Sequence, residues 1–460
     1  MSKLEGEIIN VKLIAVLAVV ALVGASAGAY LYLNSDDGDK KRSLGGNTPL
    51  EVFGNADGDY DIDEDDVKFI ERIIAGEEEE SEFADANHDG KIDQADVVQT
   101  RKLANNTAEY VCLIDGYGGF KRVNTDPQRI AVDQIQICEY TKIMGVGDRV
   151  VCGDFPASIL DEFYFDQEVV SIGGNASPDY EKIINLDIDM YLVFFSGAYE
   201  EKVQKLVGVD VLYLGMYSTD TLDLENSSFV QAILKGGYVF NNTERAESYV
   251  EWMLDLRDAI RDVTSTIAKE DRKNVLISNY SGNYWADENT LDVTVYMDGD
   301  TLGQAAILAG ARLAGEGESS YGTGGLSIRT NVEWLLEQEL DFLFLHTVRL
   351  QGNGNEVLIV PKQGYLEDNR DEFIKKEKEI AGLEYVKMVD LNEDNIFMQA
   401  GDFRNNASSG LLYAAYMCKI IYPELFEDFD PYEVHNQYMG WMGFPEYDTR
   451  EHGTFIAVEY

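Results

Sequence analysis

The sequence predicts an α/β protein whose two lobes are joined by one long helix, and three observations lead to this prediction. Residues 242–269 form one amphipathic run without glycine or proline, in which apolar residues recur at steps of three or four. At about 1.5 Å per residue such a helix is roughly 40 Å long, enough to cross a whole domain. On both sides of it, apolar strand-like runs alternate with helical patterns, which is typical of α/β units. A long surface helix on a single large domain is the alternative interpretation.

The composition narrows the classes of partner. A chain of 460 residues has room for two or three domains and a sizeable core. Its formal net charge of -47 disfavours nucleic acid and anionic lipid as direct partners, because both are themselves negatively charged. Such acidity suits an exposed, highly solvated protein, a salt-adapted protein or one that binds cations, and solubility alone accounts for most of the charges.

Cysteine and histidine are too sparse and too scattered for a zinc site. The four cysteines form no CxxC pair, and the four histidines are not spaced as metal ligands. Outside the cytoplasm, Cys112, Cys138 and Cys152 are close enough in sequence for one disulfide bridge, although sequence alone does not give the pairing.

The N-terminal segment carries one uncharged apolar run, residues 13–33. A helix of that length spans about 30 Å, the thickness of a bilayer core. A secretory signal peptide is the rival interpretation, because Ala-Ser-Ala at 25–27 resembles a cleavage site. The run continues beyond that site, so we expect a retained membrane anchor at 1–36 and a polar linker at 37–50. The protein then lies on the extracytoplasmic face of the cell membrane, or is secreted if the segment is cleaved.

Two loops further along the chain have the oxygen spacing of calcium sites. Residues 85–96, DANHDGKIDQAD, place carboxylate or amide oxygens at loop positions 1, 3, 5, 9 and 12, with glycine at position 6. Residues 55–66, NADGDYDIDEDD, repeat this spacing with Tyr60 at position 6. Ca²⁺ prefers about six to eight oxygen ligands in flexible geometry, which such loops wrap around one ion. A short helical pattern follows each loop, at 67–74 and 97–103.

These two loop–helix repeats, over residues 52–106, resemble a dockerin module, because position 12 is Asp and no helix precedes either loop. The resemblance implies two Ca²⁺ ions, with side-chain ligands from Asn55, Asp57, Asp59, Asp66, Asp85, Asn87, Asp89 and Asp96. It also implies backbone carbonyl ligands from Asp61 and Lys91, and contacts through water from Asp63 and Asp93.

Dockerins bind cohesin modules, so the resemblance also implies a cohesin-like partner. Loop positions 10 and 11, which dockerins use for recognition, often carry Ser-Thr; here they are Glu64 with Asp65, and Gln94 with Ala95. This departure puts a standard cohesin in doubt. A calcium site that serves folding alone is the other interpretation.

After residue 108 the chain alternates between strand and helix patterns. We expect strands at 129–132, 169–172, 190–195, 211–214, 275–278 and 342–345. Helices are expected at 138–144, 180–186, 302–311, 331–337 and 410–421. The expected domains are the calcium module at 51–107, a first lobe at 108–241, the interlobe helix at 242–270 and a second lobe at 271–460.

Aromatic residues follow several of these strands, and in open α/β sheets the ligand crevice lies outside the carboxyl ends of the strands. Flat aromatic faces suit a large, partly apolar ligand such as a metal chelate or macrocycle. Arg349 and Arg404 are scarce cations that can pair with carboxylates of such a ligand. His346, at a strand end, either ligates a metal of the ligand or is simply hydrogen-bonded. The candidate ligand-binding residues are Tyr199, Tyr217, Tyr280, Trp285, Arg349 and Arg404.

Several phrases, in order, resemble the class III substrate-binding proteins of ABC importers, which capture iron-siderophores, haem and cobalamin. They lie at 126–132, 144–151, 172–193, 331–344 and 411–426. The resemblance implies two Rossmann-like lobes joined by one long helix, an iron complex, haem or corrinoid in the cleft between them, and delivery to an ABC permease. One continuous helix is a poor hinge, so we expect small lobe motions and no ligand contact from the helix itself.

An enzyme is the rival class of function. The sequence has no G-x-S-x-G elbow, Walker loop or HExxH motif, so we expect no catalytic activity. A cell-surface assembly or adhesion protein, docking to a cohesin-like partner through the calcium module, is the alternative function.

Overall fold

The computed structural model describes residues 48–154, 161–165, 167–174, 177–194, 199–216, 220–280, 293–317, 324–347, 363–389, 391–404 and 407–458. Three predicted ligand-binding residues, Tyr217, Trp285 and Arg349, lie outside these ranges, as does the predicted membrane anchor at 13–33. Within the described residues, no helix is both long enough and apolar enough to span a bilayer.

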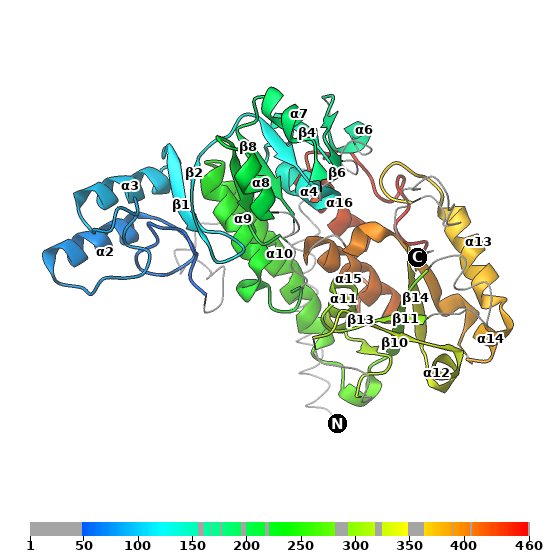
Figure 1. Cartoon of the computed structure of the whole chain (residues 1–460). Coiled ribbons are helices and arrows are strands. Elements are labelled where there is room, and N and C mark those ends of the chain that lie inside the picture. Colours follow the sequence, from blue (N-terminus) through cyan, green and yellow to red (C-terminus); the bar gives the residue numbers. More distant parts are fainter. Residues whose placement is uncertain are drawn as a thin grey trace.

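The predicted calcium module contains two short helices, α2 (Glu64–Ala75) and α3 (Gln94–Ala104). Each begins with a capping box in which an Asp caps the helix and the Asp three residues later accepts from the cap backbone. The helices share a small apolar core that includes Val67, Ile70 and Val97. A hairpin of β1 (Tyr110–Ile114) and β2 (Phe120–Asn124) follows, and Figure 1 shows the blue module at one end of the molecule, beyond this hairpin.

The first lobe is built on a five-stranded parallel sheet in the order β5-β4-β3-β8-β9. Its short apolar strands are largely buried, as a parallel sheet covered on both faces requires. The strands are β3 (Ile130–Val132), β4 (Val150–Gly153), β5 (Val170–Ser171), β8 (Met190–Val193) and β9 (Asp210–Tyr213). The helices are α4 (Gln134–Ile143), α6 (Asp161–Tyr164), α7 (Tyr180–Asn185), α8 (Tyr199–Lys205) and α9 (Ser228–Val239). A small hairpin pairs β6 (Gly173–Gly174) with β7 (Ser177–Pro178).

The predicted interlobe helix is α10 (Thr243–Thr264), whose 22 residues are about 33 Å long. Tyr249, Met253, Leu256 and Ile260 of the predicted apolar face are all buried. The helix ends before the predicted residue 269. The hydroxyls of Ser265 and Thr266 donate to backbone carbonyls three residues earlier, and such local bonds compete with continued helix.

The second lobe has a six-stranded mixed sheet in the order β13-β11-β10-β14-β15, with β12 beside the start of β10. Strands β10, β12, β14 and β15 are parallel, and β11 pairs antiparallel with both β10 and β13, so β13 runs in the same direction as β10. The strands are β10 (Asn274–Asn279), β11 (Val293–Tyr296), β12 (Arg312–Leu313), β13 (Ser327–Thr330), β14 (Phe342–His346) and β15 (Ile396–Gln399). Its helices are α11 (Thr301–Leu308), α12 (Val332–Glu337), α13 (Arg370–Ala381), α14 (Glu384–Lys387) and α15 (Ala407–Ile421).

The C-terminal segment contacts both lobes. Helix α16 (Pro431–Trp441) places the Tyr438 hydroxyl 3.3 Å from Glu139 Oε2 of the first lobe, and Tyr164 donates to the other oxygen of Glu139 at 3.1 Å. The chain then returns to the second lobe, where Ile456 forms a β-bridge with Gln399. One contiguous core includes residues of α9, α10, α11, α15 and α16, so the lobes are packed together along the interlobe helix (Figure 1).

Candidate functional site

A row of three polar residues crosses the carboxyl ends of the second-lobe sheet. Asn279 of β10 pairs with His346 of β14, and His346 pairs with Gln399 of β15. Side chains two residues apart on a strand share a face. Ile277 and Phe344, two residues before Asn279 and His346, belong to the core on the α11 and α15 side. The row therefore faces that same side.

Two polar atoms at and beside this row are buried without a hydrogen-bond partner. They are His346 Nδ1 and Gln363 Nε2. Burial, reinforced by Arg404, lowers the pKa of His346 to about 3, so its imidazole is neutral at ordinary pH. Buried polar atoms are nearly always paired, and the exceptions point to a bound group or a water. This row therefore offers unused hydrogen-bonding and metal-ligating capacity.

Arg404 lies beside the row with its charge already paired. Its guanidinium binds the buried carboxylate of Asp300, with the Nη2–Oδ2 distance 2.6 Å and the Nε–Oδ2 distance 2.9 Å. It also lies 4.9 Å from the ring centre of Tyr296, whose ring stands edge-on to His346 at 5.6 Å. Arg404 is thus available to a ligand only together with Asp300, which makes this pair close to neutral.

The carboxyl ends of the first-lobe strands carry buried charges. Asp133 follows β3 directly, and Lys202 of α8 places its ammonium 3.5 Å from Asp133 Oδ2, with both side chains almost fully buried. Burial raises the pKa of Asp133 to about 7, and the attraction of Lys202 opposes that rise. Asp154 follows β4 and is buried nearby, with Oδ2 3.5 Å from the Gln134 amide.

Two contacts join the segments that follow strands in the two lobes. The Thr221 backbone N–H, past the end of β9, donates to Gln304 Oε1 of α11 at 2.7 Å. Phe163 of α6 stacks on Tyr365 with 4.6 Å between ring centres and an interplanar angle of 4°. Segments that follow the sheets' carboxyl ends therefore meet between the lobes.

The structure places the described candidate residues in different surroundings. Tyr199 is buried in the first lobe, where its hydroxyl donates to Asp115 Oδ2 at 2.9 Å. Tyr280 packs in the core on the opposite face of the second-lobe sheet from His346, although its N–H donates to the His346 carbonyl. Arg404 alone lies beside the row.

Sequence reasoning left Gln399, Asp133, Asp154 and Lys202 out of the candidate set. Gln399, Asp133 and Asp154 are marked only by their position at or just after the end of a strand, which many surface residues share, and Lys202 lies within α8. The four cysteines are all buried and free, so the one bridge considered for Cys112, Cys138 and Cys152 is not formed.

The first calcium loop is folded around the Asp66 carboxylate. Asp66 Oδ1 accepts from the N–H groups of Ala56 and Asp57 at 2.7 and 3.1 Å, and Oδ2 accepts from Asp63 at 2.8 Å. Carboxylate oxygens of Asp61, Asp63 and Asp66 lie within 4.8 Å of one another. Burial raises the pKa of Asp66 to about 8 and that of Asp59 to about 6, with neighbouring carboxylates adding to both shifts. This concentration of oxygens suits a hard divalent cation.

The second calcium loop is built in the same way. Asp96 Oδ1 accepts from Asn87 N–H at 3.1 Å, and Asp85 accepts from Asp89 and Gly90 N–H at 3.0 and 2.8 Å. The side-chain oxygen of Asn87 is buried and has no hydrogen-bond partner. An oxygen left in that state at loop position 3, where a calcium loop supplies a ligand, fits the donor set of a calcium site.

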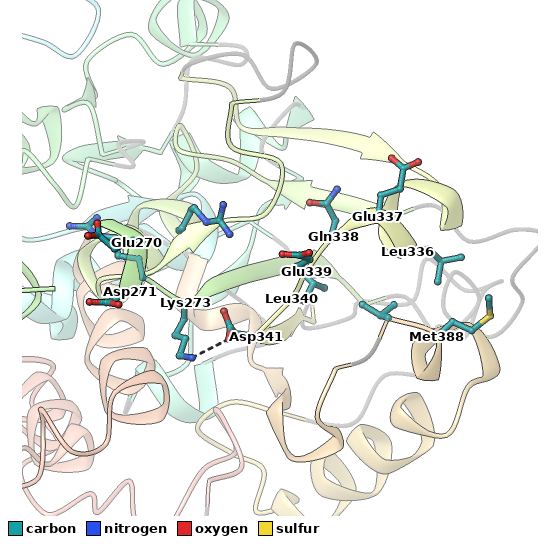
Figure 2. A pocket seen from close by; sticks show the side chains of 13 residues that line it. Glu270, Asp271, Lys273, Leu336, Glu337, Gln338, Glu339, Leu340, Asp341 and Met388 are labelled. Atoms are coloured by element: carbon teal, nitrogen blue, oxygen red, sulfur yellow. Dashed lines mark hydrogen bonds and ion pairs between the residues drawn. The ribbon is translucent and has the colours of Figure 1, made fainter. Parts of the chain in front are cut away.

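A polar pocket of about 830 Å³ lies at the opposite edge of the second-lobe sheet, where β10, β12 and β14 begin (Figure 2). Charged side chains line it, and Figure 2 marks the ion pair between Lys273 Nζ and Asp341 Oδ1 at 3.1 Å. Ligands of open α/β sheets bind at the carboxyl edge. We therefore interpret this pocket as a surface hollow with exposed ion pairs, which contribute little energy.

No protein-family model matches the chain, and no curated protein matches it in sequence. Among solved structures, it is similar to the TroA-like periplasmic binding protein FepB from Veillonella parvula, with a TM-score of 0.56 and 12% identity over 75% of this chain and 98% of that one. The molybdate periplasmic binding protein MolA of a Haemophilus influenzae ABC transporter gives a TM-score of 0.53 and 14% identity over 73% of this chain and 98% of MolA. A periplasmic solute binding protein from Veillonella parvula gives 0.52 and 13%, over 73% of this chain and 93% of that one.

At such identities the likeness concerns the fold alone. The match covers nearly the whole of each neighbour, which agrees with a shared fold. The chain therefore has the fold of a TroA-like periplasmic binding protein.

Proposed function

We propose that this chain is the extracytoplasmic substrate-binding protein of an ABC importer, without catalytic activity, held at the cell membrane by its N-terminal segment. It captures its ligand between the lobes and delivers it to an ABC permease. The observation that carries this proposal is the row Asn279, His346 and Gln399 at the carboxyl ends of three adjacent strands, in which His346 Nδ1 is buried without a hydrogen-bond partner. An unpaired buried group costs about 1–3 kcal/mol, and a polar group of a bound ligand would remove that cost.

The chemistry of the row favours an iron complex, haem or corrinoid. A neutral imidazole is a good ligand for a transition metal, and His346 remains neutral across the physiological range. The amides of Asn279 and Gln399 supply donors and acceptors for the periphery of such a ligand. Arg404, bound to Asp300, adds a polar rim with little net charge.

A thermal-shift screen of the full chain against haem, cobalamin, ferric hydroxamate and ferric catecholate siderophores, and molybdate tests this function. We expect a metal chelate or macrocycle to raise the melting temperature. Stabilisation by molybdate alone would keep the transport function and replace the proposed ligand class by an oxyanion. If none of these ligands stabilises the protein, the capture proposal is wrong.

The calcium loops are proposed to hold two Ca²⁺ ions, which would cross-link each loop through its oxygens and offset the repulsion between its carboxylates. The first ion would be held by Asn55, Asp57, Asp59, Asp61 and Asp66, and the second by Asp85, Asn87, Asp89, Lys91 and Asp96. The packed Asp66 carboxylate and the unpaired Asn87 oxygen support this proposal. Calorimetric titration of the chelator-treated full chain should show two sites. A single site would implicate Tyr60 as damaging the first loop.

A cell-surface assembly role is the second candidate, and one observation favours it. Glu64, Asp65, Gln94 and Ala95, at the loop positions by which dockerins recognise cohesins, are all exposed in the first turns of α2 and α3. A pull-down from the native cell surface separates the two functions. A cohesin-like partner retained only in Ca²⁺ would favour assembly, and a permease would favour transport.

A further inference from the structure

The first calcium loop is attached to the first lobe through its own backbone. The N–H of Ile62, at loop position 8, donates to the hydroxyl of Tyr238 in α9 at 2.6 Å, and the bond is buried. Tyr238 is almost fully buried, so its hydroxyl finds no water to replace this partner. The loop and α9 are therefore joined by a buried hydrogen bond, and separating them would leave its donor and its acceptor without a partner.

Tyr60 gives a physical reason for the departure from the calcium-loop pattern. In the second loop Gly90, at position 6, has φ +88° as the sharp turn requires. Tyr60 is not among the residues with positive φ; in the first loop it is Gly58, two residues earlier, that has φ +79°. The Tyr60 side chain is buried in the large core that also contains Val230 and Leu234 of α9. With Tyr60 at this position the loop lacks a glycine for its turn, but an aromatic side chain attaches the loop to the core of the lobe.

The segment before the first loop adds a second attachment. Asn55 of the loop donates through Nδ2 to the Leu50 carbonyl at 2.9 Å, which ties the loop to this segment. Next to Leu50, the Glu51 carboxylate lies 2.6 Å from the ammonium of Lys235, which is 2% exposed. Gln231, one turn earlier on α9, accepts from the Glu51 N–H at 3.3 Å. A buried ammonium needs its carboxylate partner, so this pair resists separation of the module from the lobe.

The second loop has different neighbours. Asp89, Gly90 and Lys91 are exposed, and the side chain of His88 stacks on Phe120 of the hairpin with 3.9 Å between ring centres. Among the described residues, the second loop contacts its own helix, the hairpin and the segment around Phe53. None of these contacts involves α9. The two loops, similar in sequence, therefore have different structural roles.

We infer that the first calcium loop is an internal docking element, through which Ca²⁺ binding and the folding of the α9 side of the first lobe are coupled, while the second loop is not coupled to α9. A ligand that stabilises one part of a cooperative unit stabilises all of it, and the coupling is reciprocal. The inference rests on the proposed calcium binding and is independent of ligand capture between the lobes.

Hydrogen exchange of the full chain, measured by mass spectrometry with and without Ca²⁺, tests the coupling. We expect Ca²⁺ to slow exchange over residues 228–239 of α9. Asp59→Asn, at position 5 of the first loop, should remove most of that protection. Asp89→Asn, at the same position of the second loop, should leave it in place. These variants are matched in chemistry and in loop position, so a general loss of charge would affect both alike.

The reciprocal effect is measured by Ca²⁺ titration of Tyr238→Phe and Tyr140→Phe. Both changes remove a buried hydroxyl beside α9, but Tyr140 donates to the Ala232 carbonyl and does not contact the loop. Tyr238→Phe should weaken one of the two Ca²⁺ sites about three- to tenfold, the factor that one lost hydrogen bond gives. Tyr140→Phe should leave both affinities unchanged.

The possible failures are distinguishable. If the chain binds no Ca²⁺, both the calcium proposal and this inference are wrong, whatever the ligand screen shows. If two ions bind but exchange over α9 is unchanged, or if Asp59→Asn and Asp89→Asn behave alike, the coupling alone is wrong. Loss of α9 protection in Asp59→Asn together with weaker Ca²⁺ binding in Tyr238→Phe supports it.

Discussion

His346 and Gln399 occupy paired positions at the carboxyl ends of β14 and β15, and His346 Nδ1 is buried there without a hydrogen-bond partner. A second buried histidine, His435 of α16, differs in this respect. His435 has its Nε2 3.2 Å from the Tyr365 hydroxyl and its Nδ1 3.2 Å from the Tyr416 hydroxyl. Both imidazoles are neutral, because burial lowers the pKa of each to about 3. Both ring nitrogens of His435 therefore have hydrogen-bond partners, whereas Nδ1 of His346 has none.

The buried ion pair of Lys202 and Asp133 should be essential to the first lobe. Lys202→Met leaves the Asp133 carboxylate buried without its cation, and we expect a loss of about 3–5 kcal/mol in the free energy of unfolding. Lys205, one turn later on α8, pairs with Glu201 at the surface. Lys205→Met should change the stability by less than about 0.5 kcal/mol. Chemical denaturation of both variants measures the difference, and equal effects would show that the buried pair is unimportant.

The four cysteines should be free and unreactive in the folded protein. Burial raises the pKa of Cys112 to about 11 and that of Cys152 to about 12, and it raises the pKa values of Cys138 and Cys418 well above the ordinary value of a thiol. The thiolate is the reactive form, so a thiol reagent should modify the native chain slowly. In denaturant without reductant the same reagent should titrate four thiols. Two or fewer thiols would reveal a disulfide and contradict the structure.

His435 should contribute to stability in a pH-dependent way. The pKa of this imidazole is about 3 in the folded protein, against about 6.5 in an unfolded chain. Between these values the unfolded state binds a proton that the folded state excludes, so this contribution is full above pH 6.5 and is lost as the pH falls toward 3. The free energy of unfolding of the wild type should therefore fall by about 1.4 kcal/mol per pH unit more steeply than that of His435→Phe between about pH 6 and pH 4. Urea denaturation at several pH values measures both slopes; parallel slopes would contradict the prediction.

Much of the fold could be predicted from the sequence, because local periodicity is strong where elements are fully buried. The apolar face of α10 and the strands β3, β8, β9, β10 and β14 were predicted near their observed positions. Strands β4, β11, β13 and β15 were not predicted. The pattern of β13, Ser-Ile-Arg-Thr, has a single apolar residue, so packing against β11 decides its conformation.

The candidate site was harder to predict, because it depends on which face of a strand a residue occupies. Tyr280 follows β10 by a single residue, and that one step turns it away from the face that His346 occupies. Lys202 lies in a different element from Asp133, and no local sequence pattern predicts the ion pair between them. The predicted calcium ligands were recognisable because their spacing lies within one loop, whereas the partner of the Ile62 N–H is Tyr238 in α9, far along the chain.

The ligand-induced change in melting temperature, measured for the wild type, His346→Phe and His435→Phe, tests most directly whether this protein captures a ligand at the row of Asn279, His346 and Gln399. The ligands are haem, cobalamin, the two classes of ferric siderophore and molybdate. We predict that at least one of them stabilises the wild type and His435→Phe, and that its effect is lost in His346→Phe. Stabilisation that survives unchanged in His346→Phe, or that no ligand of the panel produces in the wild type, would contradict ligand capture at this site.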